Sequence, residues 1–249
     1  MKILARFRGN LGDIEVWEDE ADGGRFYLED EIFQSHGSAN GRSRLDYVQI
    51  MEAFLHRAHN VLALGCGGGN LATMLADRGK EMTVVDFNPK SFEIAREFFG
   101  MPEHLRCVVD DFRNYLLSEA RCFDAIAIDV GGPGFDFEEQ FDLSTCGSIR
   151  GRLQPGGRVI INVLVGSDFD AVADKIGRYL SADFSETWIV DHPGTIRRNA
   201  LILCSDGVSD VRIEPELNSL CTIGPVPWTA RRPRRRSTDA PRAISVRQH

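Results

Sequence analysis

The stretch Val61–Asn70, VLALGCGGGN, limits the possible folds of this chain more than any other. A short apolar run ends in a loop in which four of five residues are glycine, and a helix-like segment, LATMLADRG, follows directly. A strand that ends in such a loop and continues as a helix is how an α/β sheet brings its backbone close to a nucleotide-like ligand. Gly65, Gly67 and Gly69 lack a Cβ, so the loop can turn sharply and a ligand can lie against the main chain.

The segments around this loop predict an α/β fold. Strand-like and helix-like segments alternate between residues 61 and 180, which implies a parallel sheet with helices on both faces. The expected strands are 61–64, 81–86, 105–109, 123–129 and 158–164, and the expected helices are 69–78, 89–98, 112–119, 138–152 and 168–180. Two further strands, 184–190 and 199–205, are joined by a short loop, so we expect a hairpin and an antiparallel last strand.

Composition divides the chain into three parts. Residues 1–40 hold short runs rich in branched and aromatic residues between Gly, Asp and Asn turns, and they predict a small N-terminal β-region. Residues 41–206 contain the α/β alternation, preceded by a helix expected at 43–58 with Ser43 as its candidate cap. Residues 207–249 are expected to form a poorly ordered tail, because from Thr229 onward they are polar, punctuated by proline and carry seven arginines.

Charge and composition restrict the partners and the compartment. The net charge is −8, and without the arginine-rich tail the body has 22 basic and 36 acidic residues, a net charge of −14. The body therefore suits a cationic substrate, and only the tail is suited to a weak contact with nucleic acid. No apolar run approaches the ~20 residues of a membrane span, and the N-terminus has no signal-peptide core. Six scattered cysteines without metal-ligand spacing indicate buried thiols in a reducing cytoplasm and no metal site.

Acidic residues stand at the ends of three expected parallel strands. Asp86 could accept hydrogen bonds from both hydroxyls of a ribose, and Asp110 and Asp111 could accept from the amino group of an adenine. Asp111 also precedes the expected helix 112–119 as an N-cap. Asp129 ends the strand 123–129 and is a candidate proton acceptor. Because buried carboxylates are costly without partners, their repetition at one edge of the sheet favours a ligand site.

The order of these motifs resembles that of class I S-adenosylmethionine-dependent methyltransferases. The segments that carry the resemblance are VLALGCGGG, VVDFNP, VVDDF, FDAIAID and LQPGGRVIINV, between residues 61 and 165. A nicotinamide-binding Rossmann domain shares the glycine loop and the acid after the second strand, but it does not usually have VVDDF or LQPGG. The segments GDIEV, RFYLEDEIFQSHGSANGRSRLDYVQIM and HPGTIRRNALILCS extend the likeness to spermidine synthases and their relatives, over residues 3–205.

The resemblance implies a Rossmann-like methyltransferase fold, with a mostly parallel sheet, an antiparallel last strand and a small N-terminal β-domain. It also implies S-adenosylmethionine or its decarboxylated form as the cofactor and an amine as the acceptor, and it leaves a homodimer open. The residues that it places at the cofactor are Gln34, Gly65, Gly67, Gly69, Asp86, Phe87, Asp110 and Asp111, with Asp129 as the catalytic residue and Tyr27, Gly132 and His192 as candidates on the acceptor side.

Three departures from the spermidine synthase pattern bear on the reaction. Gly132 stands where the family has the second acid of Asp-x-x-Asp, which binds the diamine, and Gly68 stands where it has the Asp that meets the aminopropyl amine. The lead helix reads YVQI where the family has Tyr-(His/Gln)-Glu-Met. Because a dication needs a carboxylate at both ends, methyl transfer is slightly favoured. Two alternatives stay open: an aminopropyltransferase that makes a polyamine, and a nucleoside-binding protein without turnover.

Overall fold

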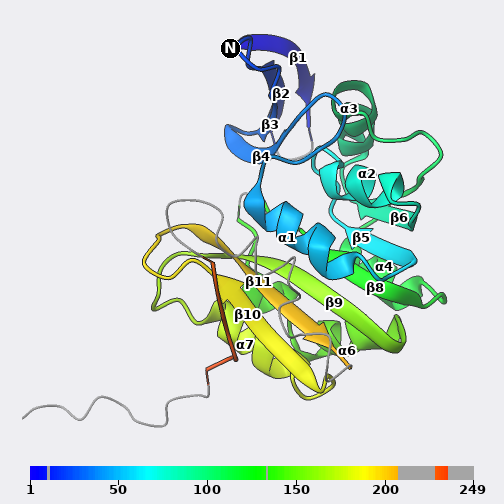
Figure 1. Ribbon diagram of the computed structural model, residues 1–249, viewed down its shortest axis with the longest axis vertical. Helices are drawn as coiled ribbons and strands as arrows, with labels where there is room; N and C mark the ends of the chain where they lie inside the picture. The colour runs from blue at the N-terminus through cyan, green and yellow to red at the C-terminus, as the bar shows by residue number, and fades with distance from the viewer. Residues whose placement is uncertain (10–11, 133, 207–227, 235–249) are drawn as a thin grey trace, which may run out of the picture.

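The computed structural model describes residues 1–9, 12–132, 134–206 and 228–234. These residues form two sheets, one of four antiparallel strands and one of eight mostly parallel strands. In Figure 1 the smaller sheet lies at the top, and the larger sheet with its covering helices lies beneath it. The expected α/β class and the small N-terminal β-region are therefore confirmed.

The N-terminal sheet has its strands in chain order: β1 (Lys2–Arg8), β2 (Asp13–Glu18), β3 (Arg25–Glu29) and β4 (Ile32–Gly37). Alternate side chains of β2 and β3, among them Ile14, Val16 and Tyr27, point to one face and are buried. They pack against Ile94 and Phe99 of a helix from the larger domain. This contact fixes β4 above the edge of the larger sheet.

The large sheet has the order β12-β10-β11-β9-β8-β5-β6-β7. Its strands are β5 (Asn60–Leu64), β6 (Glu81–Asp86), β7 (Arg106–Val109), β8 (Phe123–Ile128), β9 (Leu153–Val165), β10 (Glu186–Asp191), β11 (Arg198–Ser205) and β12 (Thr229–Arg231). Strands β5 to β9 pair in parallel, and β11 runs antiparallel to both β9 and β10, as the hairpin prediction requires. The central strands are apolar at successive positions because both faces of the sheet are covered.

Helices cover the two faces of this sheet. They are α1 (Asp46–Leu55), α2 (Asn70–Asp77), α3 (Pro89–Phe99), α4 (Phe112–Ser118), α5 (Phe137–Gln140), α6 (Leu143–Gly151) and α7 (Val172–Leu180). Helices α1, α2 and α3 share one apolar cluster with Val61 and Ala63, and α4, α6 and α7 share another with Leu62 and Leu64. Neighbouring residues of β5 thus enter opposite cores, because side chains alternate along a strand.

Local capping corrects three expected helices. The single helix expected at 138–152 is two helices, because the Asp142 side chain accepts a hydrogen bond from the backbone of Thr145 and begins α6. The first helix begins at residue 46, and Ser43 binds the backbone N–H of Leu45 instead of capping it. The helix expected at 168–180 begins at residue 172. The expected cap at Asp111 is confirmed, at 2.9 and 3.2 Å from two backbone nitrogens of α4.

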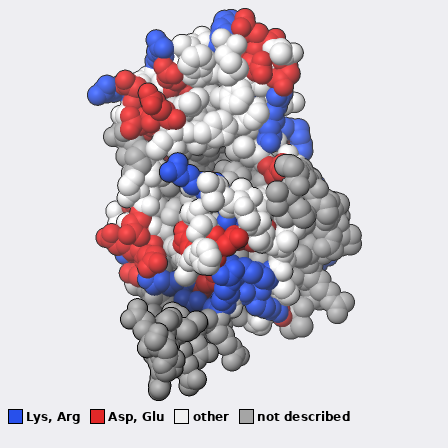
Figure 2. Space-filling view, turned by 90° about the vertical axis from the view of Figure 1, so that its left-hand side faces the viewer, with Lys and Arg blue, Asp and Glu red and all other residues white. Residues whose placement is uncertain are grey.

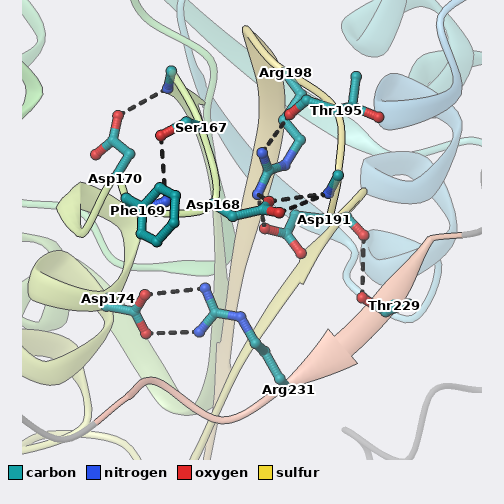
Figure 3. Close-up of polar contacts among 12 residues, drawn as sticks. Ser167, Asp168, Phe169, Asp170, Asp174, Asp191, Thr195, Arg198, Thr229 and Arg231 are labelled. Carbon is teal, nitrogen blue, oxygen red and sulfur yellow. Dashed lines mark hydrogen bonds and ion pairs between the residues drawn. The ribbon is translucent and has the colours of Figure 1, made fainter.

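The expectation of a poorly ordered tail is wrong for residues 228–234. Strand β12 pairs with β10, and Trp228 before it is buried. Arg231 donates from both terminal nitrogens to the carboxylate of Asp174 on α7, at 2.6 and 3.0 Å (Figure 3). Composition suggested a solvated basic run, whereas the structure gives this arginine a buried carboxylate partner. The remaining tail residues, 207–227 and 235–249, lie outside the described residues.

None of the helices in the described ranges is both long and apolar enough to cross a membrane.

Candidate functional site

The C-terminal ends of β5, β6, β7 and β8 open into a cavity of about 720 Å³. Residues of β3, β4 and α1 line it from the other side. Ligands of open α/β sheets bind at this edge, and small-molecule pockets have volumes of roughly 300–1,000 Å³. The cavity therefore has the position and the size of a small-molecule site.

The glycine loop forms one wall because its conformation excludes side chains. Gly65 has a φ of +94°, and a Cβ on it would lie 2.0 Å from the carbonyl oxygen of Asp129. Gly67 has a φ of +50° and also lines the cavity. Gly68 donates its N–H to the buried Ser35 hydroxyl of β4 at 2.8 Å, so the loop is fastened to the N-terminal sheet. Gly69 begins α2 and is not part of the cavity wall.

Asp86 lies at the end of β6 with both carboxylate oxygens bound to the backbone. Oδ2 accepts from the N–H of Cys66 and Oδ1 accepts from the N–H of Asn88, both at 2.8 Å. Burial raises the pKa of Asp86, the nearby Glu29 carboxylate adds to this, and the backbone hydrogen bonds oppose it. Each oxygen has a second acceptor position. The carboxylate is thus held in place and can still accept from two ligand hydroxyls.

The other expected cofactor residues surround this carboxylate. Gln34, Phe87, Asp110 and Asp111 all line the cavity, and Phe87 is largely exposed there. The N–H of Asp110 donates to the backbone oxygen of Asp86 at 3.1 Å, which holds the ends of β6 and β7 together. Asp111 uses Oδ1 for the cap of α4. Asp110, with no such task, is the better placed of the two for an adenine amino group.

Asp129 follows β8 and sits between two polar side chains from distant parts of the chain. Tyr47 of α1 donates its hydroxyl to Oδ2 at 3.1 Å, and Asn162 of β9 donates Nδ2 to Oδ1 at 2.8 Å. Burial raises the pKa of Asp129, while the hydrogen bonds from Asn162 and Tyr47 oppose the rise. A buried carboxylate with a raised pKa and room for one more donor on each oxygen is suited to take a proton.

Asn162 brings a second hydrogen-bond acceptor to the same place. Only 6% of this cavity-lining residue is exposed, and its Oδ1 has no partner within the described part of the chain. Buried polar atoms are seldom left without a partner. Asn162 and Tyr47 were absent from the expected site residues. The signal for Asn162 was the polar residue in the otherwise apolar segment VIINVLV.

The charged residues that line the cavity are all acids. They are Glu29, Asp86, Asp110, Asp111 and Asp129, with no lysine, arginine or histidine from the described residues among them. On the outer face shown in Figure 2, by contrast, acidic and basic side chains lie in adjacent patches. A cavity lined with one sign of charge attracts ligands of the opposite sign. Across the described ranges, no group of three His, Cys, Asp or Glu side chains is placed to hold a metal ion.

The three acceptor-side candidates have different positions. Gly132 lines the cavity in the loop after β8. Tyr27 also lines it, but only 1% of the residue is exposed, and burial raises the pKa of its hydroxyl. His192 lies outside the lining, with its ring centroid 3.9 Å from that of Trp228. The structure thus brings ten of the expected residues to the cavity and leaves out Gly69 and His192; the ten are Tyr27, Gln34, Gly65, Gly67, Asp86, Phe87, Asp110, Asp111, Asp129 and Gly132.

Sequence comparison identifies a methyltransferase domain. Residues 61–157 match the family model described as "Methyltransferase domain". A probable cobalt-precorrin-6B C(15)-methyltransferase (decarboxylating) from Methanobrevibacter smithii is 28% identical over 116 residues, which cover 45% of this chain and 58% of that protein. The match thus spans little more than half the length of that curated relative.

Solved structures share the fold over a larger part of the chain. A probable spermidine synthase from Corynebacterium glutamicum has a TM-score of 0.81 at 20% identity, covering 94% of this chain and 92% of that one. Spermidine synthase from Thermotoga maritima has a TM-score of 0.64 at 18% identity, covering 84% and 75%. Human methyltransferase-like protein 13, solved in complex with SAH, has a TM-score of 0.58 at 22% identity, covering 71% and 89%.

These likenesses define the class. The protein has the class I S-adenosylmethionine-dependent methyltransferase fold, and the first of these structures extends the likeness over nearly the whole chain, N-terminal sheet included. Within that class it is spermidine-synthase-like, so the resemblance read from the sequence is confirmed. The methyltransferase domain and these neighbours support a transferase of the S-adenosylmethionine type.

Proposed function

We propose that this protein binds an adenosyl sulfonium donor and transfers an alkyl group from it to an amine. The observation that carries the proposal is the set of five carboxylates around a cavity without a basic lining residue in the described chain. A sulfonium donor is a cation, and so is a protonated amine. Such a cavity favours both ligands, because negative side chains offset the cost of taking a cation out of water.

The donor fits the end of the cavity formed by β5, β6 and β7. Asp86 is held so that it can accept from two ribose hydroxyls, and Asp110 can accept from an adenine amino group. The loop around Gly65 and Gly67 lets the ligand lie against the backbone. The methyltransferase domain match and the human neighbour solved with SAH support S-adenosylmethionine as the first candidate donor.

The acceptor fits beside Asp129. A primary ammonium group is a donor of three N–H bonds, and Asp129 with the Oδ1 of Asn162 offers acceptors for it. Asp129 takes one proton, and the neutral nitrogen then attacks the carbon next to sulfur. The N–C bond forms as the C–S bond breaks, and its electron pair stays on sulfur, which leaves a neutral thioether. The alkylated nitrogen carries the positive charge until it loses a proton.

Methyl transfer is the first candidate reaction. The matched domain is a methyltransferase domain, and the residues on which a spermidine synthase would be recognised depart from that pattern. A Cβ on Gly68 would lie 3.1 Å from the Cβ of Ser35 and 3.3 Å from the ring of Phe99. An aspartate at this position would therefore need its neighbours to move, and a donor amine has no carboxylate to meet here.

Aminopropyl transfer is the second candidate. The fold likeness to a probable spermidine synthase covers 94% of the chain. The cavity lining, as far as the structure describes it, also holds no arginine or lysine that could pair with the carboxylate of S-adenosylmethionine. Its decarboxylated form lacks that group, so an all-acid lining favours it.

One experiment separates these reactions. The protein is incubated with each donor and a panel of amines, and the nucleoside product is identified by mass spectrometry. S-adenosylhomocysteine indicates methyl transfer, and methylthioadenosine indicates aminopropyl transfer. Asp129→Asn keeps the shape of the side chain and removes the proton acceptor, so the product should disappear while the nucleoside still binds. Nucleoside binding without either product would instead support the binding protein without turnover, and absence of binding would overturn the proposal.

A further inference from the structure

The five cavity acids are distributed unevenly. Glu29 comes from β3, Asp86 from the end of β6, and Asp110 and Asp111 follow β7, so four lie at the end proposed for the donor. Asp129 after β8 is the fifth. The end proposed for the acceptor therefore has a single carboxylate among the residues described.

The wall beyond Asp129 is uncharged. Asn162, which binds Asp129, and Leu164 lie two residues apart on β9 and so share one face of the strand. Asn199 of β11 is the register partner of Leu164, and all three line the cavity. Leu164 lies about 7 Å along the strand from Asn162, at ~3.3 Å per residue. An acceptor that presents one end to Asp129 thus meets an amide and an apolar side chain at its other end.

The acids nearest this wall already have partners. Arg198, which precedes Asn199, binds Asp168 at 2.9 Å and Asp191 at 3.0 Å (Figure 3). Asp168 also accepts from the N–H of Gly194 at 3.0 Å. Neither acid lines the cavity. A second ammonium group at this end would therefore lose its water without gaining a carboxylate, which is costly.

From this arrangement we infer that the acceptor is a monoamine, with one primary amino group on an uncharged body, and not a diamine. The inference rests on the proposed function and concerns the acceptor end of the same cavity. The amino group loses one proton to Asp129, and its nitrogen forms the new bond to carbon as the C–S bond of the donor breaks. The rest of the acceptor lies on Asn162, Leu164 and Asn199 and takes no part in the bond changes.

Butylamine and 1,4-diaminobutane test this directly, because they share a carbon chain and differ by one amino group. With the donor that gives product, we expect the KM of butylamine to be at least tenfold lower. Should neither amine turn over, calorimetric binding of the two amines to the protein loaded with S-adenosylhomocysteine or methylthioadenosine decides the point with the same expected ratio. An equal or tighter constant for the diamine overturns the inference.

A second carboxylate added to the wall should reverse the preference. Gly131 lines the cavity, and a Cβ on it would meet only the ring of Phe137, at 3.9 Å, so Gly131→Asp fits without a clash. Gly132 is less suitable because its φ is +148°. Gly131→Asp should lower the KM of the diamine about tenfold, and the uncharged Gly131→Asn should not. An equal change in both variants would count against the charge argument.

The two proposals fail in different ways. Transfer to diamines in preference to monoamines contradicts the monoamine inference alone, because it still demonstrates alkyl transfer to an amine. Absence of binding for both nucleosides contradicts the proposed function itself.

Discussion

Arg231→Ala should destabilise the protein strongly, although this arginine belongs to a segment whose composition suggests a solvated tail. Its partner Asp174 has a side chain that is 3% exposed, and it accepts from Arg231 at 2.6 and 3.0 Å and from the backbone N–H of Arg234 at 2.5 Å. Truncation removes two of these three donors. The carboxylate would then remain buried with one backbone hydrogen bond and no positive charge.

The size of the effect follows from burial. Breaking a buried ion pair from one side costs about 3–5 kcal/mol. The Arg231 side chain is 25% exposed and the Arg234 N–H remains, so the lower end applies, about 3 kcal/mol. For a chain of 150–250 residues, 1 kcal/mol shifts Tm by about 2–4 °C. Thermal unfolding followed by circular dichroism should therefore show a Tm lower by roughly 6–12 °C.

Arg232→Ala is the matched control, because the same strand leads into it. Arg232 pairs with Glu186 and lies over the Trp188 ring, but half of its side chain is exposed. An exposed pair contributes about 0–1 kcal/mol, so this variant should lose no more than about 2–4 °C. The double variant Asp174→Asn, Arg231→Met, which removes both charges, should recover part of the loss. Equal, small effects of both single arginine variants would refute the docking of this strand.

Three further predictions concern the cavity. Asp86→Ala should weaken nucleoside binding at least about 100-fold in calorimetry, since two hydrogen bonds to a charged group contribute about 1.5–3 kcal/mol each; unchanged affinity would refute the position of the ribose. Tyr47→Phe removes a hydrogen bond that lowers the raised pKa of Asp129, so that pKa should rise further and the acid limb of kcat/KM against pH should move to higher pH; a limb that stays in place would mean that Asp129 is not the proton acceptor. Ser35→Ala leaves the buried N–H of Gly68 without its acceptor, which should cost about 1–3 kcal/mol of stability and lower Tm in a thermal melt, whereas Ser35→Thr should not.

Part of the site could be predicted because it depends on chain order alone. In a parallel sheet the residues that follow neighbouring strands meet at one edge, whichever helices lie between them. Gly65, Asp86, Asp110 and Asp129 each follow an apolar run, so the sequence placed them together, and the cavity is found at that edge.

The partners of Asp129 could not be predicted in the same way. Tyr47 is 82 residues away and Asn162 is 33 residues away, on elements that pack from different sides. A sequence pattern shows that a residue is polar or that a strand is apolar, but not which distant side chain it meets. His192 is the converse case, because its place in the sequence suggested the acceptor side and its ring packs against Trp228.

The sequence by itself thus determined the α/β class, the glycine loop and the edge where the acids gather, because hydrophobic periodicity and strand order act locally. Only the tertiary structure decided that Asp129 lies between Tyr47 and Asn162. It also decided that Arg231 leaves the solvent for the buried carboxylate of Asp174. The physical reason is that an unpaired buried charge or polar group is costly, and the partner that relieves this cost is chosen by packing in three dimensions.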